Sequence, residues 1–170
     1  MVEESNLKYW RDAGHVARRT LEAMKDELQP GKTFHEIIES AERFIHRHGG
    51  KPAFPGTIAV NDLAAHFTTN HQIEGVEGWD GDMVLQKGDC VKIDFGVHIK
   101  GHIGDNALTL EIGNSNEHTE QIKAAKEARD AAIEMLHPGT PWYKVGQAAA
   151  QPSLDAGFQP IRNLCGHQLK

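Results

Sequence analysis

The chain has 170 residues, which at about 150 residues per domain corresponds to one domain with enough length for a buried core. Lys and Arg number 18 and Asp and Glu number 24, so the net charge is −6, and apolar residues make up 39% of the chain. This composition excludes a largely disordered chain, and the acidic balance argues against a nucleic-acid-binding surface. No apolar run approaches the roughly 18 residues of a membrane-spanning helix.

The cysteine count and the N-terminal sequence bear on localisation. The two cysteines, Cys90 and Cys165, do not make a disulfide framework, and the first residues lack the apolar segment of a secretory signal. We therefore expect a cytoplasmic protein. The one unusual feature of the composition is a total of 11 histidines, which points to metal binding or proton transfer.

The first half of the chain predicts two helices followed by strand and loop. Apolar residues recur every three or four positions over residues 6–29, which predicts a helix. Thr33 and Glu36 form a capping-box signature at the start of a second helix. Residues 51–60 are expected to form loop and strand, and residues 70–88 a surface loop.

A predicted hairpin is the segment most informative about chemistry. Residues 90–98 and 102–112 are β-branched runs, and a two-residue turn at Lys100-Gly101 would pair residues whose numbers add to 201. Asp94 and Asp105 then fall on the same face. Two neighbouring carboxylates on an apolar hairpin repel each other and lose solvation unless a cation lies between them. The hairpin alone leaves open a divalent-cation site or an exposed face with solvated aspartates.

The C-terminal third predicts two further helices and a strand. Residues 117–136 carry apolar residues at helical spacing. Residues 142–156 predict another helix, which Pro152 is expected to kink or shorten. Residues 159–164 are expected to form a final short strand. The element order predicts the α+β class, and we find no repeat or linker.

Two histidines have sequence neighbours that suggest a function. His66 follows Ala64-Ala65 at the end of a strand and turn, and His167 follows Gly166 after the last expected strand. Taken alone, each is explained more simply as a structural histidine than as a metal ligand.

Several segments, taken together and in order, resemble the type 2 methionine aminopeptidases. They are residues 50–55 and 64–68 at the active-site entry, 92–98 and 103–107 in two metal-ligand strands, and 163–167 around a metal-ligand histidine. The resemblance covers nearly the whole chain, and the absence of a long charged N-terminal extension is similar to archaeal members. It implies the pita-bread (creatinase/aminopeptidase-like) fold, in which helix pairs pack on antiparallel strands.

The resemblance also implies a dinuclear metal site. Asp94, Asp105 and His167 would hold two divalent cations (cobalt, manganese, zinc or iron), with Asp105 bridging both. His66 would contact the substrate and the developing tetrahedral centre. The implied activity is removal of the initiator methionine, and the implied partners are nascent peptides that begin with Met. No membrane or nucleic-acid partner is expected.

The resemblance stops short of the whole family pattern, which continues past His167 with another histidine and two glutamate ligands. Residues 1–170 are therefore expected to form a single, incomplete domain that is inactive alone, with the other half in a longer product or a separate chain. Two alternatives stay open. An aminopeptidase P or prolidase shares the fold and ligand order, although residues 64–68 favour the methionine enzyme. A non-catalytic pita-bread protein-binding module would not need Asp94, Asp105 and His167.

Overall fold

The computed structural model of the chain describes residues 6–69, 83–113 and 115–169. It divides into two compact units, which are Met1–Ser115 with Gln168–Lys170, and Asn116–His167. The expectation that residues 1–170 form a single, incomplete domain stays a prediction. No helix in the described ranges is both long and apolar enough to cross a membrane.

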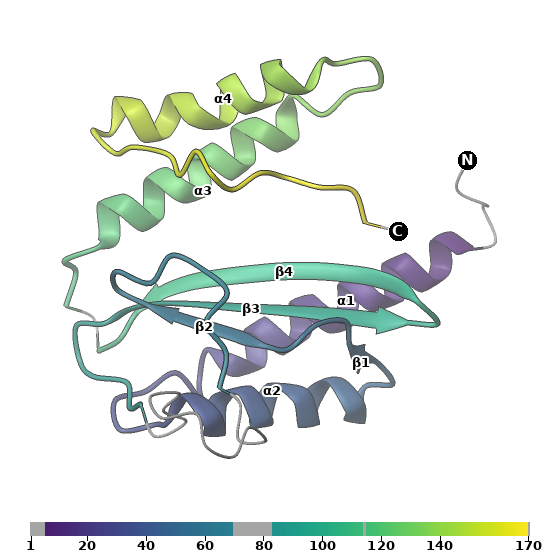
Figure 1. Cartoon of the computed structure of the whole chain (residues 1–170), viewed down its shortest axis with the longest axis vertical. Coiled ribbons are helices and arrows are strands. Elements are labelled where there is room, and N and C mark those ends of the chain that lie inside the picture. The colour runs from purple at the N-terminus through teal and green to yellow at the C-terminus, as the bar shows by residue number, and fades with distance from the viewer. Residues whose placement is uncertain (1–5, 70–82, 114, 170) are drawn as a thin grey trace. The chain divides into compact units, whose positions relative to one another are not determined.

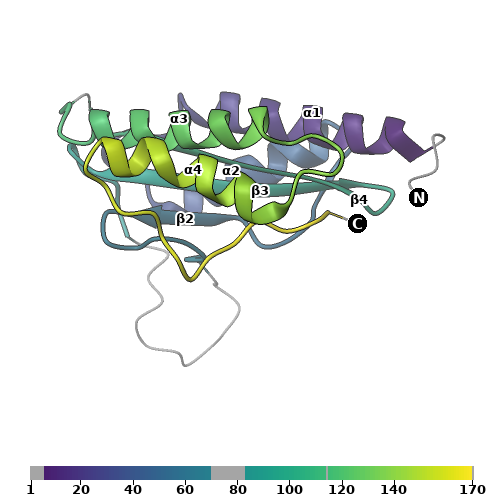
Figure 2. The same cartoon turned by 90° about the horizontal axis from the view of Figure 1, so that it is seen from above.

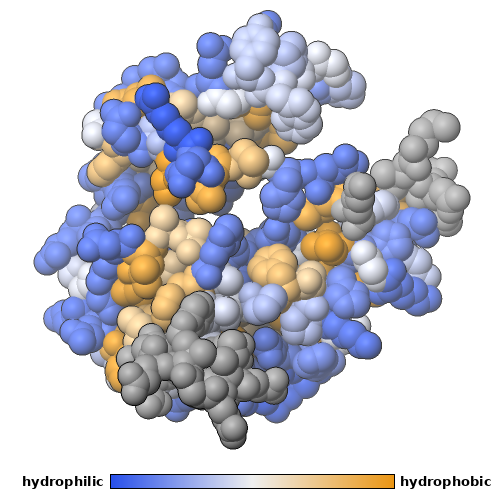
Figure 3. Space-filling model, in the orientation of Figure 1, coloured by the Kyte–Doolittle hydropathy of each residue, from blue (hydrophilic) through white to orange (hydrophobic). Residues whose placement is uncertain are grey.

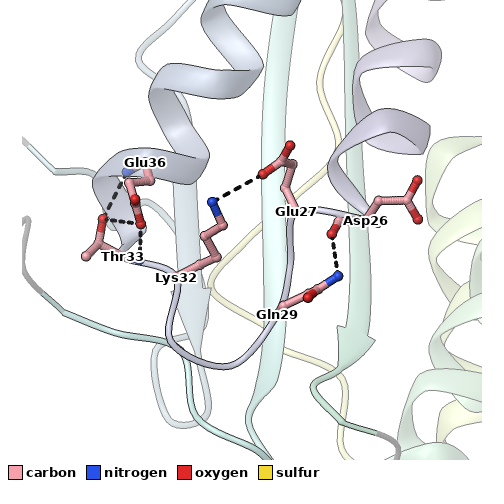
Figure 4. A network of polar contacts seen from close by, with 6 residues as sticks. All are labelled: Asp26, Glu27, Gln29, Lys32, Thr33 and Glu36. Carbon is pink, nitrogen blue, oxygen red and sulfur yellow. Dashed lines mark hydrogen bonds and ion pairs between the residues drawn. The ribbon is translucent and has the colours of Figure 1, made fainter.

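Two helices open the first unit (Figure 1). Helix α1 spans Leu7–Met24 and helix α2 spans Phe34–Arg47, close to their predicted positions. The chain after α1 remains coiled as a turn, because the N–H group of Leu28 still donates to the carbonyl of Met24. Figure 4 shows this turn, including the ion pair between Glu27 and Lys32 at 3.7 Å.

The predicted capping box at the start of α2 is confirmed. The backbone N–H of Glu36 donates to the Thr33 hydroxyl at 3.1 Å, and the Glu36 carboxylate accepts from the Thr33 N–H at 2.9 Å (Figure 4). Both contacts satisfy N–H groups that the first turn of a helix otherwise leaves without partners. They fix where α2 begins.

A four-stranded antiparallel sheet completes the first unit. Its strands are β1 (Lys51–Pro52), β2 (Thr57–Val60), β3 (Cys90–Ile99) and β4 (His102–Glu111). Strand β4 pairs with β3 along its whole length, while β1 and β2 pair with two successive parts of β3. Strand β3 is therefore the central strand and carries contacts from all three others.

The hairpin of β3 and β4 has the predicted register. Gly96 pairs with Asp105 and Ile99 with His102, so paired numbers add to 201. Lys100 and Gly101 have φ angles of 51° and 85°, and positive values at both positions match the type I′ turn that favours two-residue hairpins. The turn geometry thus fixes which side chains of the two strands share a face.

The hydrophobic core lies between one face of the sheet and the two helices, which Figures 1 and 2 show on the same side of it. Alternate residues of β3 supply the sheet side of this core, namely Val91, Ile93, Phe95 and Val97, all at most 1% exposed. Helix α1 approaches β4 closely, because a Cβ atom on Gly104 would lie 2.5 Å from the backbone nitrogen of Gly14. On the other face, the ring of Phe54 covers Gly96. Both glycines thus allow close approach of another chain segment.

The predicted surface loop over residues 70–88 is only partly open to comparison, because residues 70–82 lie outside the described residues. The part after them differs from the expectation. The N–H of Leu85 bonds to the Lys32 carbonyl at 2.9 Å, and the Leu85 side chain is 1% exposed. The apolar side chain packs into the core of the first unit, so this stretch is not simply a surface loop.

The second unit contains helices α3 (Thr119–Glu134) and α4 (Trp142–Asp155). From the sequence, Pro152 is expected to kink or shorten α4. The helix runs three residues beyond Pro152, so the proline does not end it, and the kink stays a prediction. Pro152 lies in the last turn, and its missing N–H group leaves one helical hydrogen bond unmade. The predicted strand over 159–164 is wrong, since no described strand pairs with these residues.

Figure 3 shows hydrophobic residues at the surface among hydrophilic ones.

Candidate metal centre

Asp94 and Asp105 lie on the sheet face opposite the core. Asp94 is in the middle of β3, and Asp105 on β4 pairs with Gly96, two residues further along β3. Because side chains alternate between faces, both carboxylates leave the sheet on the same side. The two side chains also form a hydrogen-bonding contact. The structure therefore brings together the two aspartates that the sequence singles out.

The environment of Asp94 disfavours an isolated negative charge. Burial raises the pKa of its carboxyl group to about 6, helped by the negative charge of Asp105 and by the hydrogen bond to it. Lys92 and His66 lower the same pKa by less. One oxygen of Asp94, Oδ1, is buried and has no hydrogen-bond partner among the residues that the structure describes. An unsatisfied buried acceptor costs about 1–3 kcal/mol, so it calls for a ligand.

A divalent cation fits these two carboxylates. Carboxylate oxygens are ligands for manganese, iron, cobalt and zinc. A cation would give Asp94 Oδ1 a partner and would offset the repulsion between the two carboxylates. The pair does not make a complete ligand set, because no three His, Cys, Asp or Glu side chains of the described residues converge on one point. Further donors are needed to complete the coordination of a cation.

His66 lies in the loop of residues 61–69 between β2 and the undescribed segment. Its side chain is exposed, so it is not a packed core histidine. It is close enough to Asp94 to influence the pKa of that carboxyl group. Its φ of 62° places its backbone in the left-handed region, which costs an ordinary residue about 1–2 kcal/mol. Such a conformation persists only where the surroundings hold it.

The ends of this loop are tied to the sheet. At its start, the Asn61 side chain accepts a hydrogen bond from the Cys90 N–H and donates one to Asp89, both at 2.9 Å. At its end, the Thr68 hydroxyl donates to the Gly56 carbonyl at 2.7 Å. Between the ends, the Lys92 ammonium group donates to the carbonyl of Ala64. This contact is not predicted by the sequence motifs.

Two other residues of interest are His167 and Cys90. His167 belongs to the second unit, where it is exposed in a stretch without helix or strand, and its role as a ligand stays a prediction. Burial raises the pKa of the Cys90 thiol, and the charge of Glu111 raises it further. Cys90 is therefore held as a thiol rather than as the thiolate that binds metals.

An α+β unit with two adjacent carboxylates, one of them carrying an unsatisfied buried oxygen, has the features of a metalloenzyme. The comparison with protein families narrows this class. The chain belongs to metallopeptidase family M24, whose model matches residues 8–170. Membership implies a divalent metal as cofactor.

Curated relatives support the same family. The chain is 37% identical over 159 residues to the methionine aminopeptidase of Thermococcus onnurineus, and 32% identical over 162 residues to that of Helicobacter pylori. The two alignments cover 93% and 95% of this chain, but 50% and 63% of the relatives. The chain thus spans about half the length of the archaeal relatives that it matches.

Solved structures show the same fold. The chain is similar to the methionine aminopeptidase of Rickettsia prowazekii with a TM-score of 0.87 and 24% identity, covering 99% of this chain and 67% of that one. It is similar to the prolidase of Pyrococcus furiosus with a TM-score of 0.76 and 24% identity, covering 91% and 44%. The expected pita-bread fold, with a helix pair on antiparallel strands, is confirmed.

Proposed function

We propose that this chain supplies the N-terminal half of the active site of a metal-dependent aminopeptidase that removes the initiator methionine from nascent peptides. The proposal rests on Asp94 and Asp105 lying on one face of the hairpin, with a buried Asp94 oxygen that has no hydrogen-bond partner among the described residues. Its substrates are cytoplasmic peptides whose N-termini begin with Met, as the names of the 31–38% identical relatives suggest.

In this proposal Asp94, Asp105 and His167 hold two divalent cations, which are cobalt, manganese, zinc or iron. Such cations supply Lewis acidity that polarises a scissile carbonyl and activates water. Asp105 would be a ligand shared by both cations, as the family resemblance implies. Asp94 would have to lose its proton to hold a cation, so its raised pKa would couple metal binding to proton release. The remaining ligands would come from a segment that corresponds to the half of the relatives not spanned by this chain.

His66 acts without holding a cation. Its exposed imidazole is close enough to Asp94 to influence the pKa of that carboxyl group, and a neutral ring there could donate a hydrogen bond to a substrate oxygen that gains negative charge. One such donor is worth about 10²-fold in rate or more. The left-handed backbone of His66 fits a residue that is held in place for function.

Metal binding tests the role of the aspartates. We expect Asp105→Ala to abolish binding of Mn²⁺ or Co²⁺, because it removes the bridging ligand, and Asp94→Ala to weaken mainly one site. Calorimetric titration of a hybrid, in which this chain is joined to the C-terminal half of the Thermococcus onnurineus relative, measures both. Asp26→Ala is the matched control, since Asp26 is an exposed aspartate in the turn after α1. Unchanged metal binding by Asp105→Ala would contradict the proposal.

Hydrolysis of peptides tests the role of His66. The assay uses a hybrid in which this chain is joined to the C-terminal half of the Thermococcus onnurineus relative. We expect His66→Ala to keep its bound metal and to lose about 10²-fold in kcat/KM on Met-Ala peptides. Loss of metal would make His66 a ligand, and an unaltered kcat/KM would leave it without a catalytic role.

The same assay separates the alternatives. A prolidase-like enzyme, suggested by the likeness to the prolidase of Pyrococcus furiosus, would cleave Ala-Pro in preference to Met-Ala. A non-catalytic module would bind no metal and cleave neither peptide. Cleavage of Met-Ala with metal bound favours the methionine enzyme.

A further inference from the structure

Lys92 is a component of the site to which the sequence motifs assign no role. It lies on β3 two residues before Asp94, so both side chains leave the same face of the sheet. Its ammonium group reaches the loop of residues 61–69 and donates a hydrogen bond to the carbonyl of Ala64. Lys92 therefore joins the strand that carries Asp94 to the loop that carries His66.

The position of this contact relative to His66 is important. Ala64 lies two residues before His66, and on the other side the Phe67 carbonyl accepts a hydrogen bond from the Ile58 N–H at 2.9 Å. The left-handed backbone of His66 lies between these two attachments. Asn61 and the Thr68 hydroxyl hold the ends of the loop, whereas Lys92 holds its middle.

The Lys92 ammonium group makes its hydrogen bond to the loop and not to Asp94, although its charge lowers the pKa of the Asp94 carboxyl group. The structure shows no ion pair between the Lys92 ammonium group and the Asp94 carboxylate, and within the described ranges the Asp94 oxygen Oδ1 has no hydrogen-bond partner. The ammonium group is instead engaged with a neutral carbonyl of the loop. A lysine bound directly to Asp94 would compete with a cation for the same oxygens, and this arrangement avoids that competition.

We propose that Lys92 is a positioning residue, whose ammonium group holds the middle of the loop so that His66 stays beside Asp94. The inference rests on the proposed function in so far as His66 contacts the substrate. The role of Lys92 in ordering the loop can be tested apart from the proposed function, because the order of the loop can be measured without metal or substrate.

The first experiment measures loop order in the purified chain by ¹⁵N relaxation. In the wild type we expect amides 63–67 to be rigid, with order parameters of about 0.85, and in Lys92→Met to fall below about 0.6. Lys100→Met is the matched control, since its ammonium group donates to the Tyr9 hydroxyl at 3.0 Å at the hairpin turn. It should leave the loop rigid, and Lys92→Arg should retain most of the order because it keeps a charged donor.

Amide shifts of β3 and β4 confirm that each variant is folded, and Lys92→Gln replaces Lys92→Met if the latter unfolds. A loop that is equally ordered in the wild type and in the Lys92 variants would overturn the proposal. So would a loop that is already mobile in the wild type. Neither result depends on whether the protein is an aminopeptidase.

The second experiment asks whether Lys92 acts through His66, using the metal-loaded hybrid and Met-Ala peptides. We expect Lys92→Met to lower kcat about tenfold with little change in KM or metal content, and Lys92→Arg to restore most of it. In a His66→Ala background, Lys92→Met should have no further effect, because residues that act as one unit are not additive. Equal losses of kcat in both backgrounds would overturn the positioning role. If the hybrid is inactive but the order of the loop depends on Lys92, the result counts against the proposed function alone.

Discussion

Burial and neighbouring charge act on Asp94 in the same direction. Both raise the pKa of its carboxyl group, to about 6, from an ordinary value of 3.8. The unfolded chain therefore loses this proton at a lower pH than the folded chain does. The contribution to folding stability is fully present below about pH 4, is lost as the pH rises towards 6, and is absent above it.

This linkage predicts a pH dependence that belongs to one residue. Between pH 4 and pH 6 the Tm of the metal-free chain should fall relative to that of Asp94→Asn, because asparagine carries no titrating group. Above pH 6 Asp94→Asn should be the more stable protein. Thermal unfolding followed by circular dichroism from pH 4 to 7.5 measures both. Parallel curves for the two proteins would show that Asp94 is not perturbed.

Single residues differ in how far the sequence predicts them. The common face of Asp94 and Asp105 follows from the two-residue turn, since strand periodicity then fixes every side chain of the hairpin. The contact of Lys92 with Ala64 could not be predicted, because it depends on where a loop without regular structure returns to the sheet. Its one signal is the position of Lys92 two residues before Asp94.

At the level of elements, the contact of α1 with β4 depends on two glycines. A Cβ atom on Gly104 would lie 2.5 Å from the Gly14 backbone nitrogen, and a helix backbone cannot move aside as a flexible side chain can. A Cβ atom on Gly14, by contrast, would meet nothing within 4 Å. The two positions therefore respond oppositely to alanine although they touch each other.

We expect Gly104→Ala to destabilise the chain by about 1–3 kcal/mol through overpacking. Gly14→Ala should stabilise it by about 0.5–1 kcal/mol, because alanine loses less backbone entropy in a helix interior. Urea unfolding of both variants and the wild type provides the measurement. Since Gly104 directly precedes Asp105, Gly104→Ala should also weaken metal binding. Similar stabilities for the two variants would contradict the close packing.

The elements that the sequence predicts best are those with local signals. The capping box at Thr33 and the turn at Lys100-Gly101 involve neighbours in the chain, and both form as expected. The strand over 159–164 was predicted wrongly, because a strand needs a partner and the local pattern does not show whether one exists. The burial of Leu85 likewise depends on distant residues of the first unit.

At the level of the whole molecule, the number of ligands limits what the chain can do. Asp94, Asp105 and His167 are three side chains for the two cations of the proposed site, and each cation needs about four to six donors. The relatives are about twice as long as this chain, which covers 50% of the Thermococcus onnurineus enzyme. The spacing of the cations is therefore not fixed by the residues of this chain alone.

The surface of the second unit adds a separate constraint. Trp142 is 79% exposed, Tyr143 63% and Ile133 58%, and Figure 3 shows hydrophobic residues at the surface of the chain. No side chain of α4 is buried among those described. Apolar side chains that are open to water promote association.

These two constraints predict that the 170 residues alone bind metal weakly, hydrolyse no Met-Ala peptide and self-associate as their concentration rises. Calorimetric metal titration, a peptide assay and sedimentation measure the three properties, each with this chain and with the hybrid. The hybrid should bind metal more tightly and cleave the peptide, because it has the additional ligands. Trp142→Lys should reduce association without changing metal affinity, since Trp142 carries no ligand atom. Peptide cleavage by the 170 residues alone would contradict this prediction and would require that a second copy of the chain supplies the other ligands. A mixture of Asp105→Ala and His167→Ala chains would then recover part of the activity.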